Sequence, residues 1–138
     1  LAAHGFETRL NLSDEFLGSA HLLPLTHTAT RMPADVVIAQ PGLHSEFLRR
    51  CRPVDIGGHV APLISVEDLV VTKVLAARRK DLEDVRGVLL EQWGSMDFEY
   101  VERVLAARMI ALDDPRLAPR FARVVRQVER LLDQPPRR

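Results

Sequence analysis

The feature that most constrains the fold is a change of pattern near Ser65. Before this residue, short apolar segments alternate with Pro and Gly turns, and after it apolar residues recur at helical spacing with almost no strand signal. Strands in one half and helices in the other are typical of the α+β class. We therefore expect an α+β fold in one domain, sheet-rich over residues 1–64 and helical over residues 65–138.

Composition narrows the function classes. The chain has 46% apolar and 28% charged residues, which is the ordinary range of globular proteins. Its 19 basic and 19 acidic side chains cancel, so overall charge gives no argument for a nucleic-acid partner. Zero net charge does not exclude a local basic patch, although the 17 arginines are scattered along the sequence. Cys51 is the only cysteine, which excludes a disulfide framework and favours the cytoplasm.

No apolar run reaches the ~18 residues that a membrane-spanning helix requires, so we expect no membrane partner. The familiar signatures GxGxxG, GxxxxGK[ST], CxxC, HExxH and GxSxG are absent from the sequence. The five histidines share no tight ligand spacing, and a zinc site is therefore not predicted.

The first half contains the predicted strands. Residues 21–27 and 34–39 have strand character, and the second run is β-branched between Pro33 and Pro41. Helical spacing follows over residues 42–52. Gly57 and Gly58 separate two β-prone runs, residues 53–56 and 59–62, which predicts a tight hairpin.

Four helices are predicted in the second half. Ser65 is expected to cap a helix over residues 66–79, with Asp68 in its first turn. Asp81 with Asp84 repeats this start signal, Asp97 caps a third helix, and Asp114-Pro115 opens a fourth. The predicted buried stripes of the last three helices are Leu82, Val85, Val88 and Leu89; Phe98, Val101, Val104 and Leu105; and Leu117, Phe121, Val124, Val128 and Leu131 or Leu132.

Asp35 is the first candidate functional residue, because it is a lone carboxylate inside the apolar run 34–39. One interpretation places Asp35 at a strand end in contact with water. The other makes it a base or a Mg²⁺ ligand at a sheet edge, since hard cations bind oxygen ligands.

Lys73 is the second such residue. It projects among apolar and small residues on the helix side that faces the protein. Its stem could cover apolar surface while the ammonium reaches water. The functional alternative is an ammonium that passes Ala76 and Ala77 toward a phosphate group.

A third feature is the charged cluster of residues 78–85 at a helix junction. Its structural interpretation is that Asp81 caps the helix and that Lys80 pairs with Asp84 at i, i+4. Taken alone, this cluster requires no function.

Taken together, these features resemble a known family. The strand with Asp35, the Gly-Gly hairpin, the segment 62–69, Lys73 and the segment 79–85 are similar to minimal nucleotidyltransferases, most closely to the bacterial branch of AbiEii-type toxins and MNT antitoxins. The resemblance covers residues 1–90. It implies a mixed sheet with flanking helices, and two-metal transfer of a nucleotidyl group from an NTP.

The resemblance also implies roles for single residues. Asp35 matches the third catalytic carboxylate, a Mg²⁺ ligand, and Lys73 matches the lysine of the helix that follows. Asp81 and Asp84, with Lys80 beside them, match the downstream acidic motif.

The sequence departs from the family pattern upstream of Asp35. No Gly-Ser or Gly-Gly loop precedes a strand with an Asp-x-Asp pair there, and Ser13-Asp14-Glu15 lacks a strand context. Residues 1–6 resemble the last turn of a helix that Gly5 closes, so we expect the missing segment to lie upstream. The alternative is a degenerate relative without catalysis.

Two functions follow from the resemblance. The first is a fragment of a Mg²⁺-dependent toxin-antitoxin nucleotidyltransferase with an NTP substrate, whose acceptor is a tRNA 3′ end, a Tyr or Ser of a partner toxin, or a small molecule. The second is a non-catalytic, antitoxin-like interaction module that neutralises a partner. The oligomeric state stays open in both cases.

We expect residues 1–138 alone to have little or no transfer activity, because Asp35 cannot replace three carboxylates. Incubation with labelled NTP, Mg²⁺ and total tRNA measures this. Robust labelling that is lost in Asp35→Ala would contradict the expectation.

Overall fold

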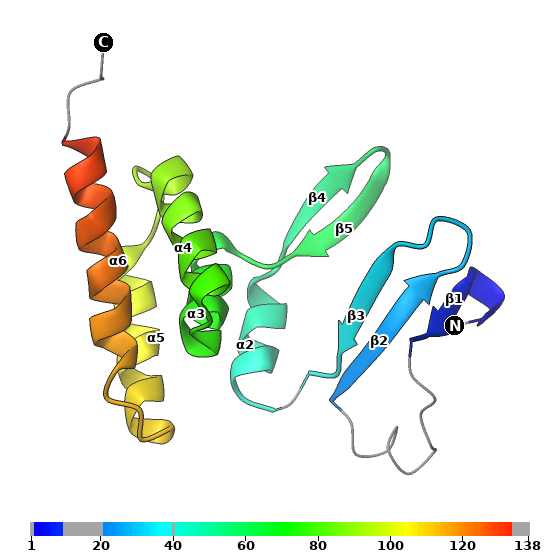
Figure 1. The fold of residues 1–138 in the computed structure, drawn as a ribbon, viewed down its shortest axis with the longest axis horizontal. Helices are drawn as coiled ribbons and strands as arrows, with labels where there is room; N and C mark the ends of the chain where they lie inside the picture. The colour runs from blue at the N-terminus through cyan, green and yellow to red at the C-terminus, as the bar shows by residue number, and fades with distance from the viewer. Residues whose placement is uncertain (1, 10–20, 40, 134–138) are drawn as a thin grey trace. The chain divides into compact units, whose positions relative to one another are not determined.

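The computed structural model describes residues 2–9, 21–39 and 41–133, and it divides the chain into two compact units, Leu1–Glu46 and Phe47–Arg138. The predicted α+β class is confirmed (Figure 1). The segment Ser13–Glu15 and the C-terminal Pro135-Pro136 lie outside the described residues.

The first unit contains a three-stranded antiparallel sheet. A short 3-10 helix, η1 (Ala2–His4), is followed by Gly5, whose φ of +73° is the left-handed conformation predicted for it. The strands β1 (Phe6–Thr8), β2 (Leu22–His27) and β3 (Pro33–Val37) follow, and β2 lies in the centre. Both predicted strands are confirmed, although β3 begins one residue earlier and ends two residues earlier than expected.

The second unit begins within α2 (Leu43–Arg50), the helix predicted over residues 42–52. The strands β4 (Arg52–Ile56) and β5 (His59–Leu63) then form the predicted antiparallel hairpin. Gly57 and Gly58 have φ of +62° and +86°, and a two-residue turn of this kind requires positive φ at both positions. Every strand pair among the described residues is antiparallel, so this part of the chain lacks the parallel pair that a mixed sheet requires.

Four helices complete the second unit: α3 (Val66–Ala76), α4 (Arg79–Gln92), α5 (Phe98–Ala111) and α6 (Leu117–Leu132). Helix α3 packs against the other three, and α6 packs against both α4 and α5 (Figure 1). The buried core of these helices consists of Val70, Val71, Val74, Val85, Leu89, Val101, Leu105, Leu117, Phe121, Val124 and Val128.

The predicted apolar stripes are thus confirmed at their central positions. The predicted burial of Leu131 or Leu132 at the end of the α6 stripe is wrong, because both residues are exposed. They lie in the last turn of α6, beyond the final buried residue, Val128.

Two predicted helix caps are confirmed. The Ser65 hydroxyl accepts the backbone N–H of Asp68 at 3.1 Å, and the Asp97 carboxylate accepts that of Tyr100 at 2.9 Å. Such caps satisfy N–H groups that have no partner inside the helix.

Three predicted helix boundaries are wrong. Helix α3 ends at Ala76 instead of residue 79, because Ala77 adopts a left-handed conformation with φ +55°. Residues other than glycine rarely adopt this conformation, so the sequence does not predict it at an alanine. Helix α4 begins at Arg79, so Asp81 is its third residue and not its cap. Helix α6 begins at Leu117 instead of Pro115.

The core makes a direct prediction. Replacing the fully buried Leu105 by Ala leaves a cavity in the helical unit and should lower the free energy of unfolding by about 3 kcal/mol. Ile110→Ala on the same helix is the control, because Ile110 is 82% exposed and should change stability by less than about 0.5 kcal/mol. Urea unfolding measures both, and equal losses would contradict this description of the core.

Candidate functional site

The turn between α3 and α4 brings three of the predicted site residues together. Ala77 is left-handed and Arg78 is extended, so the chain reverses within two residues. Lys73 in the last turn of α3 therefore meets the first turns of α4. Its Nζ donates to Asp84 Oδ2 at 2.6 Å and to Asp81 Oδ1 at 3.4 Å.

Asp81 is the most enclosed member of this group, with only 2% of its side chain exposed. Arg78 donates to both of its carboxylate oxygens, from Nε at 2.6 Å and from Nη2 at 3.2 Å. The hydrogen bonds from Arg78 lower the pKa of Asp81, burial opposes this, and Lys73 adds to the lowering. One buried carboxylate thus holds two cations from the end of α3 and the turn.

Lys73 is held as an ammonium. Its hydrogen bond to Asp84 raises its pKa, burial opposes this, and Asp81 raises it further. An ammonium has three N–H donors, and the two carboxylates use two of them. The Lys73 side chain is 30% exposed, so its carboxylate partners do not enclose it completely.

We call Lys73, Arg78, Asp81 and Asp84 the junction cluster. Its two cations and two carboxylates balance, so it does not attract an anion by net charge. Any phosphate must therefore be bound through direct hydrogen bonds.

Two expectations about this segment need correction. Asp81 does not cap α4 but lies inside it as the partner of Lys73 and Arg78. Among the described contacts, Asp84 pairs with Lys73 instead of the predicted Lys80, which is an exposed residue of the first turn of α4.

Asp35 belongs to the other unit. It lies on the edge strand β3 opposite Pro24, its side chain is 55% exposed, and it forms an ion pair with Arg9. The structural interpretation placed Asp35 at a strand end in contact with water. The solvent contact is present, but Asp35 is the middle residue of β3 and not its end.

The described residues do not form a complete metal site. Within the ranges 2–9, 21–39 and 41–133, no three His, Cys, Asp or Glu side chains are placed to hold a metal ion. Asp35 offers one carboxylate, which is short of the three that the family pattern implies. No reaction step through a metal follows from these residues.

A second buried carboxylate, Asp68, was not predicted as a site residue from the sequence, where it was expected only in the first turn of a helix. Asp68 is fully buried and accepts hydrogen bonds from Arg50 Nε at 3.0 Å and from the Tyr100 hydroxyl at 2.6 Å. The Arg50 guanidinium also lies 3.9 Å from the centre of the Tyr100 ring. One available signal was its spacing, because Asp68 precedes the buried Val71 by three residues and so shares its face.

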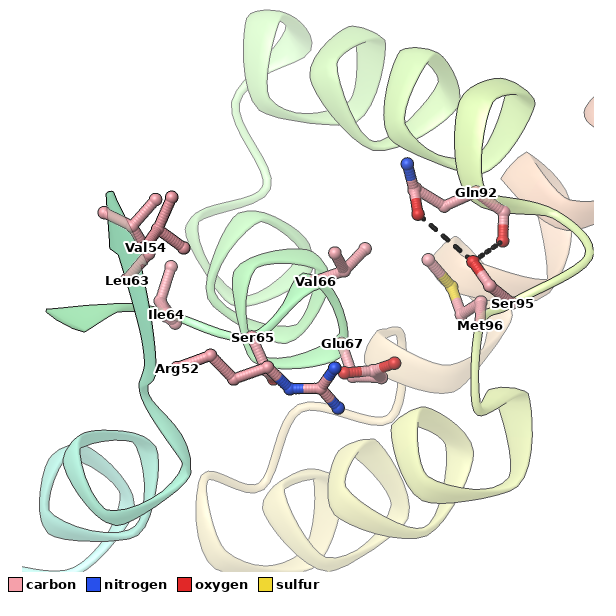
Figure 2. A pocket seen from close by; sticks show the side chains of 10 residues that line it. All are labelled: Arg52, Val54, Leu63, Ile64, Ser65, Val66, Glu67, Gln92, Ser95 and Met96. Carbon is pink, nitrogen blue, oxygen red and sulfur yellow. Dashed lines mark hydrogen bonds between the residues drawn. The ribbon is translucent and has the colours of Figure 1, made fainter. Parts of the chain in front are cut away.

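A pocket of about 310 Å³ opens near the start of α3 (Figure 2). Its walls come from the hairpin β4–β5, from residues 65–67 and from the end of α4 with the loop that follows. Ser95 donates to the side-chain oxygen of Gln92 at 3.1 Å on one side of the pocket (Figure 2). The pocket contains no residue of the junction cluster and is separate from the predicted site.

Comparison with known families identifies the chain. The sequence model of a family described as "nucleotidyltransferase of unknown function (DUF6036)" matches residues 18–126. The chain therefore belongs to this nucleotidyltransferase family, and the match includes Asp35 and the whole junction cluster. No curated protein matches the chain.

Among the described helices, none is both long and apolar enough to cross a membrane.

The junction cluster predicts a pH-dependent stability. A carboxyl group whose pKa is lowered in the folded state stabilises the fold above its unfolded pKa and loses that contribution as the pH falls through the folded value. Asp81→Asn should therefore lower the melting temperature by about 5 °C at pH 7, and the difference from the parent should shrink below about pH 4.

Glu91→Gln, at an exposed carboxylate of the same helix, is the matched control and should leave the melting temperature nearly unchanged. A difference between Asp81→Asn and the parent that stays constant from neutral to acidic pH would contradict the ion pairing.

Proposed function

We propose that this chain is the NTP-binding part of a Mg²⁺-dependent nucleotidyltransferase of the minimal nucleotidyltransferase and AbiEii-type branch. It would act in the cytoplasm, within a bacterial toxin-antitoxin system, and transfer a nucleotidyl group from NTP to an RNA or protein acceptor. The observation that carries the proposal is the family match over residues 18–126, which supports nucleotidyltransferase-type chemistry.

Lys73 is proposed as the phosphate-binding residue. Two arguments support this role: its pKa is raised, so it stays charged at neutral pH, and its third N–H donor is not used by Asp81 or Asp84. Asp81 and Asp84 position the ammonium, and Lys80 contributes a further positive charge in the same turn of α4.

Asp35 is proposed as a magnesium ligand. Mg²⁺ commonly binds one or two carboxylates and takes its other ligands from substrate phosphates and water. An ion that arrives with the NTP therefore needs fewer protein ligands than a resident one. When bound, Mg²⁺ polarises a phosphoryl oxygen and neutralises charge.

Two variants distinguish a phosphate-binding Lys73 from a merely structural one. Lys73→Met removes the ammonium and should weaken Mg²⁺–NTP binding about tenfold, which corresponds to the loss of one charge-assisted hydrogen bond. Asp84→Asn leaves the ammonium in place and weakens its restraint, so NTP affinity should stay the same or increase. Calorimetric titration with a non-hydrolysable NTP measures both.

Both variants disturb the junction cluster, so both should lower the melting temperature. A merely structural Lys73 would give similar affinity losses in the two variants, in step with their melting temperatures. That result, or unchanged affinity in Lys73→Met, would refute the phosphate role.

One observation favours the second candidate function, an antitoxin-like interaction module. The hairpin β4–β5 exposes apolar side chains, among them Ile56 at 56% and Val60 at 71% exposure. Exposed apolar surface often marks a protein interface. A parent chain that melts cooperatively and binds no NTP with Mg²⁺ would favour this candidate over the transferase.

A further inference from the structure

A groove between α4 and α6 collects arginines that are scattered in the sequence. It has a volume of about 250 Å³, and the two helices that form it pack side by side (Figure 1). Its lining consists of Arg79, Leu82, Glu83 and Arg86 from α4, and of Arg120, Arg123, Val124 and Gln127 from α6. We call this the arginine groove.

The arginine groove carries a local positive charge in a chain whose formal net charge is zero. Four arginines line it, against the single carboxylate of Glu83. Arg79 and Glu83 form a loose pair at 3.3 Å in which both side chains are mostly exposed. Exposed pairs of this kind are weak and easily exchanged for another anion.

The remaining arginines differ in how they are held. Arg120 is 20% exposed and pairs with Asp114 at 2.9 Å, which fixes its position in the wall of the groove. Arg86 and Arg123 are exposed, and among the described residues no carboxylate pairs with either of them. Two guanidinium groups that have no ion-pair partner in the described part of the chain therefore line the groove, one from each helix.

The positive row continues along α6. Arg116, Arg120, Arg123, Gln127 and Arg130 follow one another at alternating spacings of four and three residues, which places them along one face of the helix. From residue 116 to residue 130 this row extends roughly 21 Å at 1.5 Å per residue. The row is long enough to contact several successive phosphates of one strand.

From these observations we infer that the arginine groove binds the phosphate backbone of a nucleic-acid strand. The planar guanidinium binds phosphate with two parallel hydrogen bonds, and a row of such groups fits a chain of anions better than one ion. Leu82 and Val124 form an apolar floor between the charged walls. The groove shares no residue with the junction cluster, so this binding requires neither NTP nor transfer.

The test measures binding of a fluorescently labelled single-stranded RNA to the whole chain by anisotropy, without NTP or Mg²⁺. The double variant Arg86→Gln/Arg123→Gln should weaken binding about tenfold and flatten the slope of log affinity against log salt by about 1.4. The control, Arg49→Gln/Arg103→Gln, removes the same charge from exposed positions of α2 and α5, neither of which lines the groove. It should retain nearly the parent affinity.

Three results would overturn the inference: no binding by the parent, equal losses in the two double variants, or displacement of RNA by an acidic peptide of equal charge. A DNA strand of the same sequence separates the two sources of the phosphate backbone. Either equal binding of RNA and DNA or preferential binding of RNA supports the groove. Melting temperatures of the variants should equal that of the parent, since both groove arginines are exposed.

Discussion

The buried carboxylate of Asp81 is the constraint on which the helical unit depends. A charge without compensation in that position would destabilise the fold, so Lys73 and Arg78 must stay within hydrogen-bond distance. Both cations precede α4 in the chain. The left-handed Ala77 is the local conformation that brings them back onto the first turns of α4.

Helix α3 is fixed by buried carboxylates at both of its ends. In its first turn, Asp68 binds Arg50 from α2 and Tyr100 from α5. In its last turn, Lys73 binds Asp81 and Asp84. The fully buried Val70 and Val71 lie between Asp68 and Lys73, and the fully buried Val74 directly follows Lys73. The Lys73 side chain, held by two carboxylates, has little rotational freedom left. Restricted rotation of this kind is the condition for a preorganised ligand contact.

The elements that follow from local chemistry could be predicted from the sequence. Two successive glycines define the hairpin turn, Ser65 and Asp97 cap their helices, and the periodicity of α6 gives its buried face as far as Val128. The end of α3 could not be predicted, because nothing in the sequence marks Ala77 as left-handed. Asp81 was taken for a cap, since an acid near a helix start has that role more often than burial with two cations.

The sites show the same division between local and long-range information. Lys73, Asp81 and Asp84 were singled out by their positions in the sequence and by a family pattern, and their mutual contacts depend on a turn that neither describes. The Asp68–Arg50–Tyr100 network joins residues 18 to 50 positions apart, and the arginine groove joins residues of α4 and α6 that are at least 34 positions apart. Such groups are created by helix packing, and single-sequence periodicity does not report which helices become neighbours.

The central claim is that the ion-paired ammonium of Lys73 also binds the phosphates of an NTP. The chain has only two lysines, Lys73 and Lys80, so the ¹⁵N resonances of its lysine ammonium groups can be assigned with one substitution. Titration with Mg²⁺ and a non-hydrolysable NTP should shift the Lys73 ammonium resonance strongly and saturably, and that of the exposed Lys80 much less. A Lys73 resonance that stays unchanged at saturating nucleotide, or that shifts no more than Lys80, would contradict the account.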